Sequence, residues 1–270
     1  MVLAWGFGGR ATSSMPAADH QADPLNTEVF EPMPGALTSL NAPHRPPRRD
    51  RGGSAVDRIY DSLNHEIVNF IREPGQTIAK NDIAETFGVS QTPVREALLR
   101  LEAEGLVDIV PQSRTQVSLI DVQHAWEAHF LRLSVEIEVV RHLSHRITAD
   151  ELAHLRTWVD RQVTELKAGD ATAFKIADNS FHAELFDLAG VQGLTRLIDS
   201  RRGHYDRIRG LYLRAEERRK VVIKEHRAML KALEAGDERA AEAAVRVHLG
   251  KSLGIVDQIR DAHPDYFLPT

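Results

Sequence analysis

The stretch DIAETFGVSQTPVREALLRLEAEGLV, residues 82–107, decides the fold of the N-terminal half of this chain. Gly88 begins a tight turn between two helical segments, because glycine readily adopts the left-handed conformation that ends a helix. Ser90 can cap the second segment, which runs to Glu104, and Pro93 is tolerated in its first turn. The stretch therefore predicts two helices joined by a short turn.

The flanking residues extend this pair of helices into a larger unit. Apolar residues recur at helical spacing over residues 56–71, and Pro74 and Gly75 end that run. Farther along, alternating runs at 106–110 and 115–118 predict a small β-hairpin. Three helices followed by a hairpin is the layout of a winged helix-turn-helix, in which the third helix enters the major groove of DNA.

The third helix of this unit has one apolar and one polar face. Its inner stripe consists of Val94, Ala97, Leu98 and Leu101. Its outer face carries Gln91, Thr92, Arg95 and Arg100, and Ser90 precedes it. Glutamine can pair with adenine, arginine with guanine, and either can bind phosphate. From the residues alone, a helical hairpin with a solvated face explains this pattern equally well.

Residues 82–107 closely resemble the N-terminal domain of the GntR superfamily of transcription regulators. The resemblance implies binding to double-stranded operator DNA, with the family's contact positions at Asn81, Gln91, Thr92 and Arg95 and in the wing, where Arg114 lies. Relatives often have arginine at positions 81 and 91 and glycine at the wing tip. These departures affect the expected operator sequence more than the fold.

The chain after Asp121 carries only helix signals. Glycine–aspartate pairs at 169–170 and 236–237 each place a helix end against the next helix start, as in short-looped bundles. The predicted helices are 121–145, 148–169, 170–190, 192–214, one ending at 236, and 237–260. The predicted fold class is mainly α, with an N-terminal winged helix-turn-helix and an all-α bundle of six to seven helices. The predicted domains are a flexible or disordered extension (1–52), a DNA-binding domain (53–120) and an effector domain (121–262).

Four residues of the helical part form a candidate metal site. Asp178 and His182 are four residues apart, so both project from one helix face, and His226 and His248 lie on two later helices. One carboxylate and three imidazoles suit Zn²⁺, Ni²⁺, Mn²⁺ or Fe²⁺. In a chain with 13 histidines, a chance pairing is the alternative.

The same residues lie in segments that resemble the FCD ligand domain of FadR-type regulators. The segments are Leu131-Arg132 with Glu136, Asp178 to His182, Glu225-His226, Ala235 to Asp237, and Val247 to Leu249. The resemblance implies a metal at the floor of a helical cavity, held by all four residues. It also implies that Arg132 faces the pocket, where a guanidinium binds a carboxylate bidentately. The alternative for Arg132 is a surface pair with Glu136, four residues on.

Arg209 and Tyr212 are further candidates for lining the effector cavity. Most other histidines, His129 and His204 among them, are expected at the surface or at helix ends, and Trp126 is expected to pack inside.

Together these features predict a homodimeric, ligand-responsive repressor that binds a divalent metal and a small carboxylate effector. It is not expected to be an enzyme, and no His-Glu-x-x-His motif occurs. A metal-responsive sensor and a metal-dependent hydrolase are the alternatives. The chain has no cysteine and no apolar run long enough to span a bilayer, which favours a cytoplasmic location away from membranes.

Overall fold

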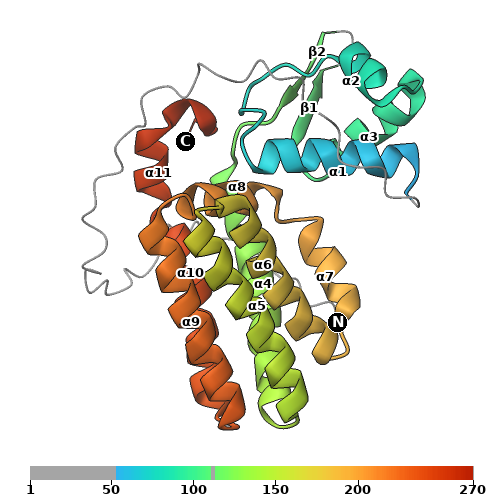
Figure 1. The fold of residues 1–270 in the computed structure, drawn as a ribbon. Helices are drawn as coiled ribbons and strands as arrows, with labels where there is room; N and C mark the ends of the chain where they lie inside the picture. The colour runs from blue at the N-terminus through green and yellow to red at the C-terminus, as the bar shows by residue number, and fades with distance from the viewer. Residues whose placement is uncertain (1–52, 111–112, 270) are drawn as a thin grey trace, which may run out of the picture.

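A computed structural model describes residues 53–110 and 113–269; the predicted extension at residues 1–52 lies outside them. Figure 1 shows an N-terminal unit of three helices and a hairpin above a bundle of longer helices. The mainly α fold class is confirmed. The elements are α1 (Ala55–Val68), α2 (Lys80–Phe87), α3 (Gln91–Ala103), β1 (Val107–Val110), β2 (Arg114–Val117), α4 (Val122–Ser144), α5 (Ala149–Ala168), α6 (Ala171–Leu188), α7 (Gln192–Asp199), α8 (Gly203–Tyr212), α9 (Glu216–Glu234), α10 (Glu238–Gly254), α11 (Val256–Ala262) and the 3₁₀ turn η2 (Pro264–Tyr266).

The N-terminal unit has its own hydrophobic core, centred on α3. The predicted inner stripe of α3 is completely buried, and it packs against α1 and against the strands. Gly88 is left-handed at the end of α2, with φ of 62°, as the turn prediction requires. Strands β1 and β2 pair antiparallel, with Val107 opposite Val117 and Val110 opposite Arg114. The winged helix-turn-helix layout is therefore present.

Two local predictions in this unit are wrong. Ser90 occupies the N-cap position of α3, but its side chain makes no capping hydrogen bond. The first helix ends at Val68, before Ile71, which is 54% exposed. Phe70 has a left-handed backbone (φ 59°), so the chain turns away before the apolar run ends.

The bundle forms a second hydrophobic core, in which α4 packs on α10, α5 on α6 and on α9, and α9 on α10. The predicted helix caps are present. Thr148 and Glu151 form a capping box, Asp170 and Asp237 cap α6 and α10, and Gly169 is left-handed at the end of α5. Trp126, expected inside, is 44% exposed on α4.

Two predicted helices of the bundle are broken. The predicted helix 192–214 is two helices, α7 and α8, and the one predicted to reach 260 breaks at Ile255 between α10 and α11. Helix α8 is buried on nearly every side, although it carries charged residues. Because charged residues share its buried positions with apolar ones, α8 has the pattern of neither an exposed nor an apolar helix. The sequence therefore contains no clear signal that a new helix begins at Gly203.

Helix α8 lies at the junction between the two units (Figure 1). The buried Arg207 donates from Nη1 to the Ser118 carbonyl (2.6 Å) and from Nη2 to the His204 Nδ1 (2.8 Å). His204 Nδ1 also accepts from the Asp121 backbone N–H (3.0 Å). His204 and His129 are each only 4% exposed, so the expectation that they lie at the surface is wrong. These contacts tie the connection between β2 and α4 to the bundle.

The close approach of α8 to the N-terminal unit gives a testable prediction. A Cβ on Gly203 would lie 2.7 Å from the Leu106 side chain, whereas a Cβ on Gly250 would meet nothing within 4 Å. We expect Gly203→Ala to destabilise the protein by roughly 1–3 kcal/mol through overpacking. Gly250→Ala, the control, should stabilise it by up to about 1 kcal/mol because alanine is the better helix former. Thermal unfolding midpoints measure both; equal midpoints for the two variants would refute the packing.

Candidate metal centre, effector pocket and DNA-reading surface

The structure brings the four predicted metal ligands together in the bundle core. Asp178 and His182 come from α6, His226 from α9 and His248 from α10. One ligand atom from each lies within 4.8 Å of those of the others, and all four residues are buried. Asp178 and His182 are therefore not a chance pair on the protein surface.

The outer nitrogen of each imidazole has an oxygen partner. Nδ1 of His182 lies 2.8 Å from Glu136 Oε2, and Nδ1 of His248 lies 3.0 Å from Glu225 Oε2. Nδ1 of His226 lies 2.9 Å from the amide Oε1 of Gln162. Carboxylate and amide oxygens accept hydrogen bonds, so these partners place the proton of each neutral ring on Nδ1.

The inner nitrogens, Nε2 of each ring, consequently carry no proton, and their lone pairs point toward one another. Nε2 of His248 lies 3.1 Å from Nε2 of His182 and 3.2 Å from Nε2 of His226. Burial lowers the pKa of His182 to about 3 and lowers the pKa values of His226 and His248, so the rings stay neutral. Three acceptors at this spacing repel one another unless a cation lies between them. The donor set therefore fits a divalent metal ion.

Sequence reasoning missed one residue that orients this cluster. Gln162 is fully buried on α5, and its amide fixes the ring of His226. Its position seven residues after Leu155 and three after Val159, both buried, was the available signal: a polar side chain on an apolar helix face. Glu136 and Glu225 lay within the quoted motifs, but only the structure gives them the role of histidine partners.

Arg209 and Tyr212, predicted to line the effector cavity, are both buried on α8. Arg209, on α8, ion-pairs with Asp178 and donates to Asn179 Oδ1 (2.9 Å), so it contacts the metal cluster itself. Burial lowers the pKa of Arg209 to about 9. Tyr212 is buried one turn later, beneath the Arg218 guanidinium. Neither is among the residues lining the neighbouring pocket.

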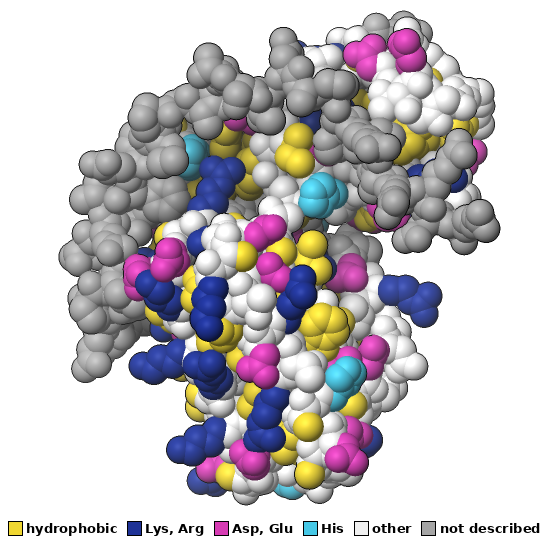
Figure 2. Space-filling model, viewed as in Figure 1, with side chains coloured by type: hydrophobic (Ala, Val, Ile, Leu, Met, Phe, Trp, Pro, Cys, Tyr) yellow, Lys and Arg dark blue, Asp and Glu magenta, His cyan; other side chains and the backbone are white. Residues whose placement is uncertain are grey.

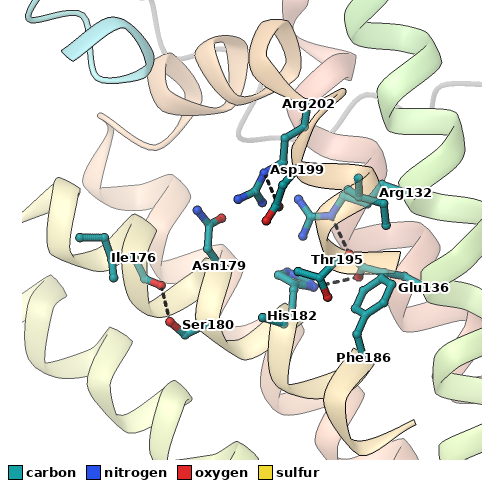
Figure 3. Close-up of a pocket in the computed structure, with 12 residues that line it drawn as sticks. Arg132, Glu136, Ile176, Asn179, Ser180, His182, Phe186, Thr195, Asp199 and Arg202 are labelled. Atoms are coloured by element: carbon teal, nitrogen blue, oxygen red, sulfur yellow. Dashed lines mark hydrogen bonds and ion pairs between the residues drawn. The ribbon is translucent and has the colours of Figure 1, made fainter. Parts of the chain in front are cut away.

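That pocket opens beside the cluster and has a volume of about 270 Å³. Figure 3 shows Arg132 and Glu136 on one side, Asn179 on the opposite side, and Asp199 and His182 between them. His182 thus belongs to both the cluster and the pocket. A small molecule in the pocket would therefore contact one residue of the cluster, His182.

Arg132 has the features of a ligand-binding arginine. Its Nε donates to Glu136 Oε1 at 2.6 Å, so the predicted pairing exists, but both side chains are buried. Its two terminal nitrogens, Nη1 and Nη2, are buried without a hydrogen-bond partner in the described part of the chain. Arg132 and His182 hold the pKa of Glu136 below its usual value, against the effect of burial. Two unpaired guanidinium donors beside a metal cluster match a carboxylate.

The predicted DNA contacts are exposed, and one of them differs from the rest in its contacts. Asn81, Ser90, Gln91, Thr92 and Arg95 are all exposed around the start of α3, and Arg114 is exposed at the start of β2. The side chains of Asn81 and Gln91 are hydrogen-bonded to each other.

Arg100 is the exception. It donates to Asp57 at 2.9 Å and stacks over Tyr60 (4.1 Å to the ring centre), farther along α3. The guanidinium therefore contacts two residues of α1, unlike the other predicted DNA contacts. Elsewhere, Figure 2 shows basic and acidic side chains mixed over the bundle, unlike a uniformly basic nucleic-acid surface.

Comparison with known proteins identifies the class to which this fold and these sites belong. Residues 55–117 match the family described as bacterial regulatory proteins, gntR family, and residues 127–251 match the FCD domain. An HTH-type transcriptional regulator from an unstable DNA locus of Streptomyces ambofaciens is 32% identical over 77% of this chain and 88% of its own length. The chain belongs to the GntR family and carries an FCD domain.

Further relatives agree with this assignment. The HTH-type transcriptional repressor RspR of Escherichia coli K12 is 28% identical, over 78% of this chain and 92% of its own. The solved structure of E. coli McbR/YncC has the same fold, with a TM-score of 0.67 at 20% identity over 77% of this chain and 99% of its own. The protein is a DNA-binding transcription regulator and not an enzyme. In the described residues, no helix is long and apolar enough to cross a membrane.

The partner of His226 offers a test of the metal centre. Gln162→Leu removes the acceptor of the Nδ1 proton while keeping a side chain of similar size. Loss of such an outer partner typically weakens metal binding about 10–100-fold, and we expect that range here. A competitive chelator titration with Zn²⁺ measures it. Gln123→Leu, at an exposed position on α4, should bind Zn²⁺ as the parent does, and equal affinity for both variants would contradict the arrangement.

Proposed function

We propose that this regulator is a homodimeric repressor whose effector domain binds a divalent metal ion and a small carboxylate, and that the effector controls operator binding. The observation that carries the proposal is the shared position of His182. Its Nε2 faces the convergent imidazoles, while its ring borders the pocket that Arg132 lines, whose two terminal nitrogens lack hydrogen-bond partners in the described residues. The proposed working units are residues 53–120 for DNA and 121–262 for metal and effector, in a cytoplasmic protein.

The metal ligands of this proposal are Asp178, His182, His226 and His248. Without a thiolate, the set is compatible with Zn²⁺, Ni²⁺, Mn²⁺ or Fe²⁺. A bound ion supplies a Lewis acid that can hold a carboxylate oxygen. Arg132 offers two parallel N–H donors to the same carboxylate, while Glu136 fixes the guanidinium by accepting from Nε.

A second candidate function is a metal-responsive sensor, in which the metal is itself the signal. The buried cluster alone fits either function. The pocket and the two unpaired nitrogens of Arg132 favour an organic ligand, because an unpaired buried donor costs about 1–3 kcal/mol or more unless something binds it. We therefore prefer the carboxylate effector.

On DNA, the exposed start of α3 is proposed to enter the major groove, with Arg114 of the wing near the backbone. Two copies would read the two halves of a pseudo-palindromic operator. Repression is supported by the printed name of one relative, RspR. Release by effector requires that the effector bind one arrangement of the domains more tightly than the other.

Two arginines of α3 provide a matched test of the DNA surface. We expect Arg95→Ala to weaken binding to a promoter fragment by about 1–3 kcal/mol, the usual value of a good base contact. Arg100→Ala should have little effect, because Arg100 is held by Asp57 and Tyr60. Fluorescence anisotropy at fixed salt compares the two. A loss in Arg100→Ala equal to or larger than that in Arg95→Ala would overturn the assigned surface.

A further inference from the structure

We infer that Thr195 and Asn179 make the pocket selective for a short monocarboxylate that also carries a hydroxyl group. This inference rests on the proposed function, because it takes the Arg132 end of the pocket as the carboxylate site. It adds which further group of the ligand the pocket recognises. Thr195 and Asn179 come from α7 and α6, and both line the same pocket as Arg132.

The hydroxyl group of Thr195 is available to hydrogen-bond a ligand. Its Oγ1 is buried and has no hydrogen-bond partner in the described residues. The two serines nearest the site differ: Ser180 donates to the Ile176 carbonyl at 2.9 Å, and Ser200 to the Leu197 carbonyl at 2.8 Å. A hydroxyl group can both donate and accept, so a ligand hydroxyl would satisfy Thr195 where a methylene would leave it unpaired.

Asn179 has a fixed orientation. Its Oδ1 accepts from Arg209 at 2.9 Å, so the groups that its amide can offer a ligand are N–H donors. In Figure 3 its side chain lies at the rim of the pocket, across from Arg132. A hydroxyl oxygen can accept from this amide while the carboxylate remains at Arg132.

The charges at the rim argue against a second carboxylate. Arg202 is paired with Asp199 (3.0 Å), which lines the pocket, and with Asp206 (3.1 Å), which does not, so its charge is already matched by two carboxylates. The lining also includes the apolar side chains Phe186 and Ile198. The pocket volume of about 270 Å³ is at the small end for ligand sites.

The test uses zinc-loaded full-length protein and acids that share one carbon chain: butyrate, 2-hydroxybutyrate and 3-hydroxybutyrate. We expect at least one hydroxy acid to bind ten or more times as tightly as butyrate, measured by thermal shift and calorimetry. Thr195→Val should abolish this preference while leaving butyrate binding intact. Ser180→Ala should preserve it, because that hydroxyl is already committed to the backbone.

The outcomes separate the inference from the proposed function. If butyrate and both hydroxy acids bind equally, or if Thr195→Val keeps the preference, the inference is wrong while the carboxylate site stands. If none of the three acids binds to the parent protein or to Arg132→Met, the proposed carboxylate site is wrong, and the inference is wrong with it.

The C-terminal segment carries an independent inference. Residues 264–268 lie beyond both family matches, which end at 117 and 251. The Ile120 N–H donates to the Tyr266 carbonyl (2.7 Å), and the Leu268 N–H donates to the Ile120 carbonyl (3.0 Å). Phe267, between them, is 3% exposed and belongs to the bundle core. The segment therefore pairs with the connection that joins the two units.

Tyr266 extends this pairing to the DNA-binding unit. Its ring stacks on Phe70 with a centroid distance of 5.5 Å, and its hydroxyl donates to Glu73 Oε1 at 3.0 Å. Phe70 and Glu73 lie between α1 and α2. We infer that residues 264–268 act as a strap that restrains the DNA-binding unit against the bundle.

Hydrogen exchange tests the strap in the full chain. Tyr266→Ala removes the stacking and the hydrogen bond to Glu73 but keeps the buried Phe267. We expect amides of residues 69–76 and of Ile120 to exchange several times faster, with exchange in α4 to α10 unchanged. Asp265→Ala, an exposed neighbour in the same turn, is the control. Unchanged exchange at 69–76 in Tyr266→Ala would overturn the strap, and so would an equal increase in Asp265→Ala.

Discussion

The arrangement of this bundle depends on three imidazole lone pairs that point at one another in its interior. Each ring is fixed from behind by an acceptor: Glu136 on α4, Gln162 on α5 or Glu225 on α9. Neutral rings held in this way cannot relieve the repulsion by turning, and burial prevents them from taking up protons. The metal ion that we propose at the meeting point would resolve the conflict and link α6, α9 and α10. The outer acceptors extend that link to α4 and α5.

Helix α8 connects this centre to the DNA-binding unit. Arg209 contacts Asp178 and Asn179, which belong to the metal cluster and the pocket. Two residues earlier, Arg207 holds the Ser118 carbonyl, directly after the wing. A ligand that changes the charge near Asp178 therefore acts on a helix that also positions the wing. Coupling of this kind requires two arrangements of α8 that the effector binds with different affinity.

Much of the N-terminal unit was predictable from residues 82–107, because its apolar stripe, its glycine turn and its alternating strands obey local rules. Local rules failed where tertiary contacts decided the outcome. Arg207 and His204 look like surface residues in the sequence but are buried on α8, where Arg207 donates to the Ser118 carbonyl and His204 accepts from the Asp121 N–H. Tertiary contacts also decide where α1 ends, at Val68, and where the predicted helix breaks before Gly203.

The four metal ligands could be proposed from residue types, spacing and resemblance, whereas Gln162 and the unpaired atoms of Arg132 and Thr195 required coordinates. A sequence pattern cannot indicate which buried polar atoms lack hydrogen-bond partners. The most direct test of the central claim is the X-ray absorption spectrum of the zinc-loaded protein. The account predicts a first shell of nitrogen and oxygen at about 2.0–2.1 Å with outer scattering from three imidazole rings. A zinc-free protein after loading, or a spectrum without imidazole scattering, would contradict it.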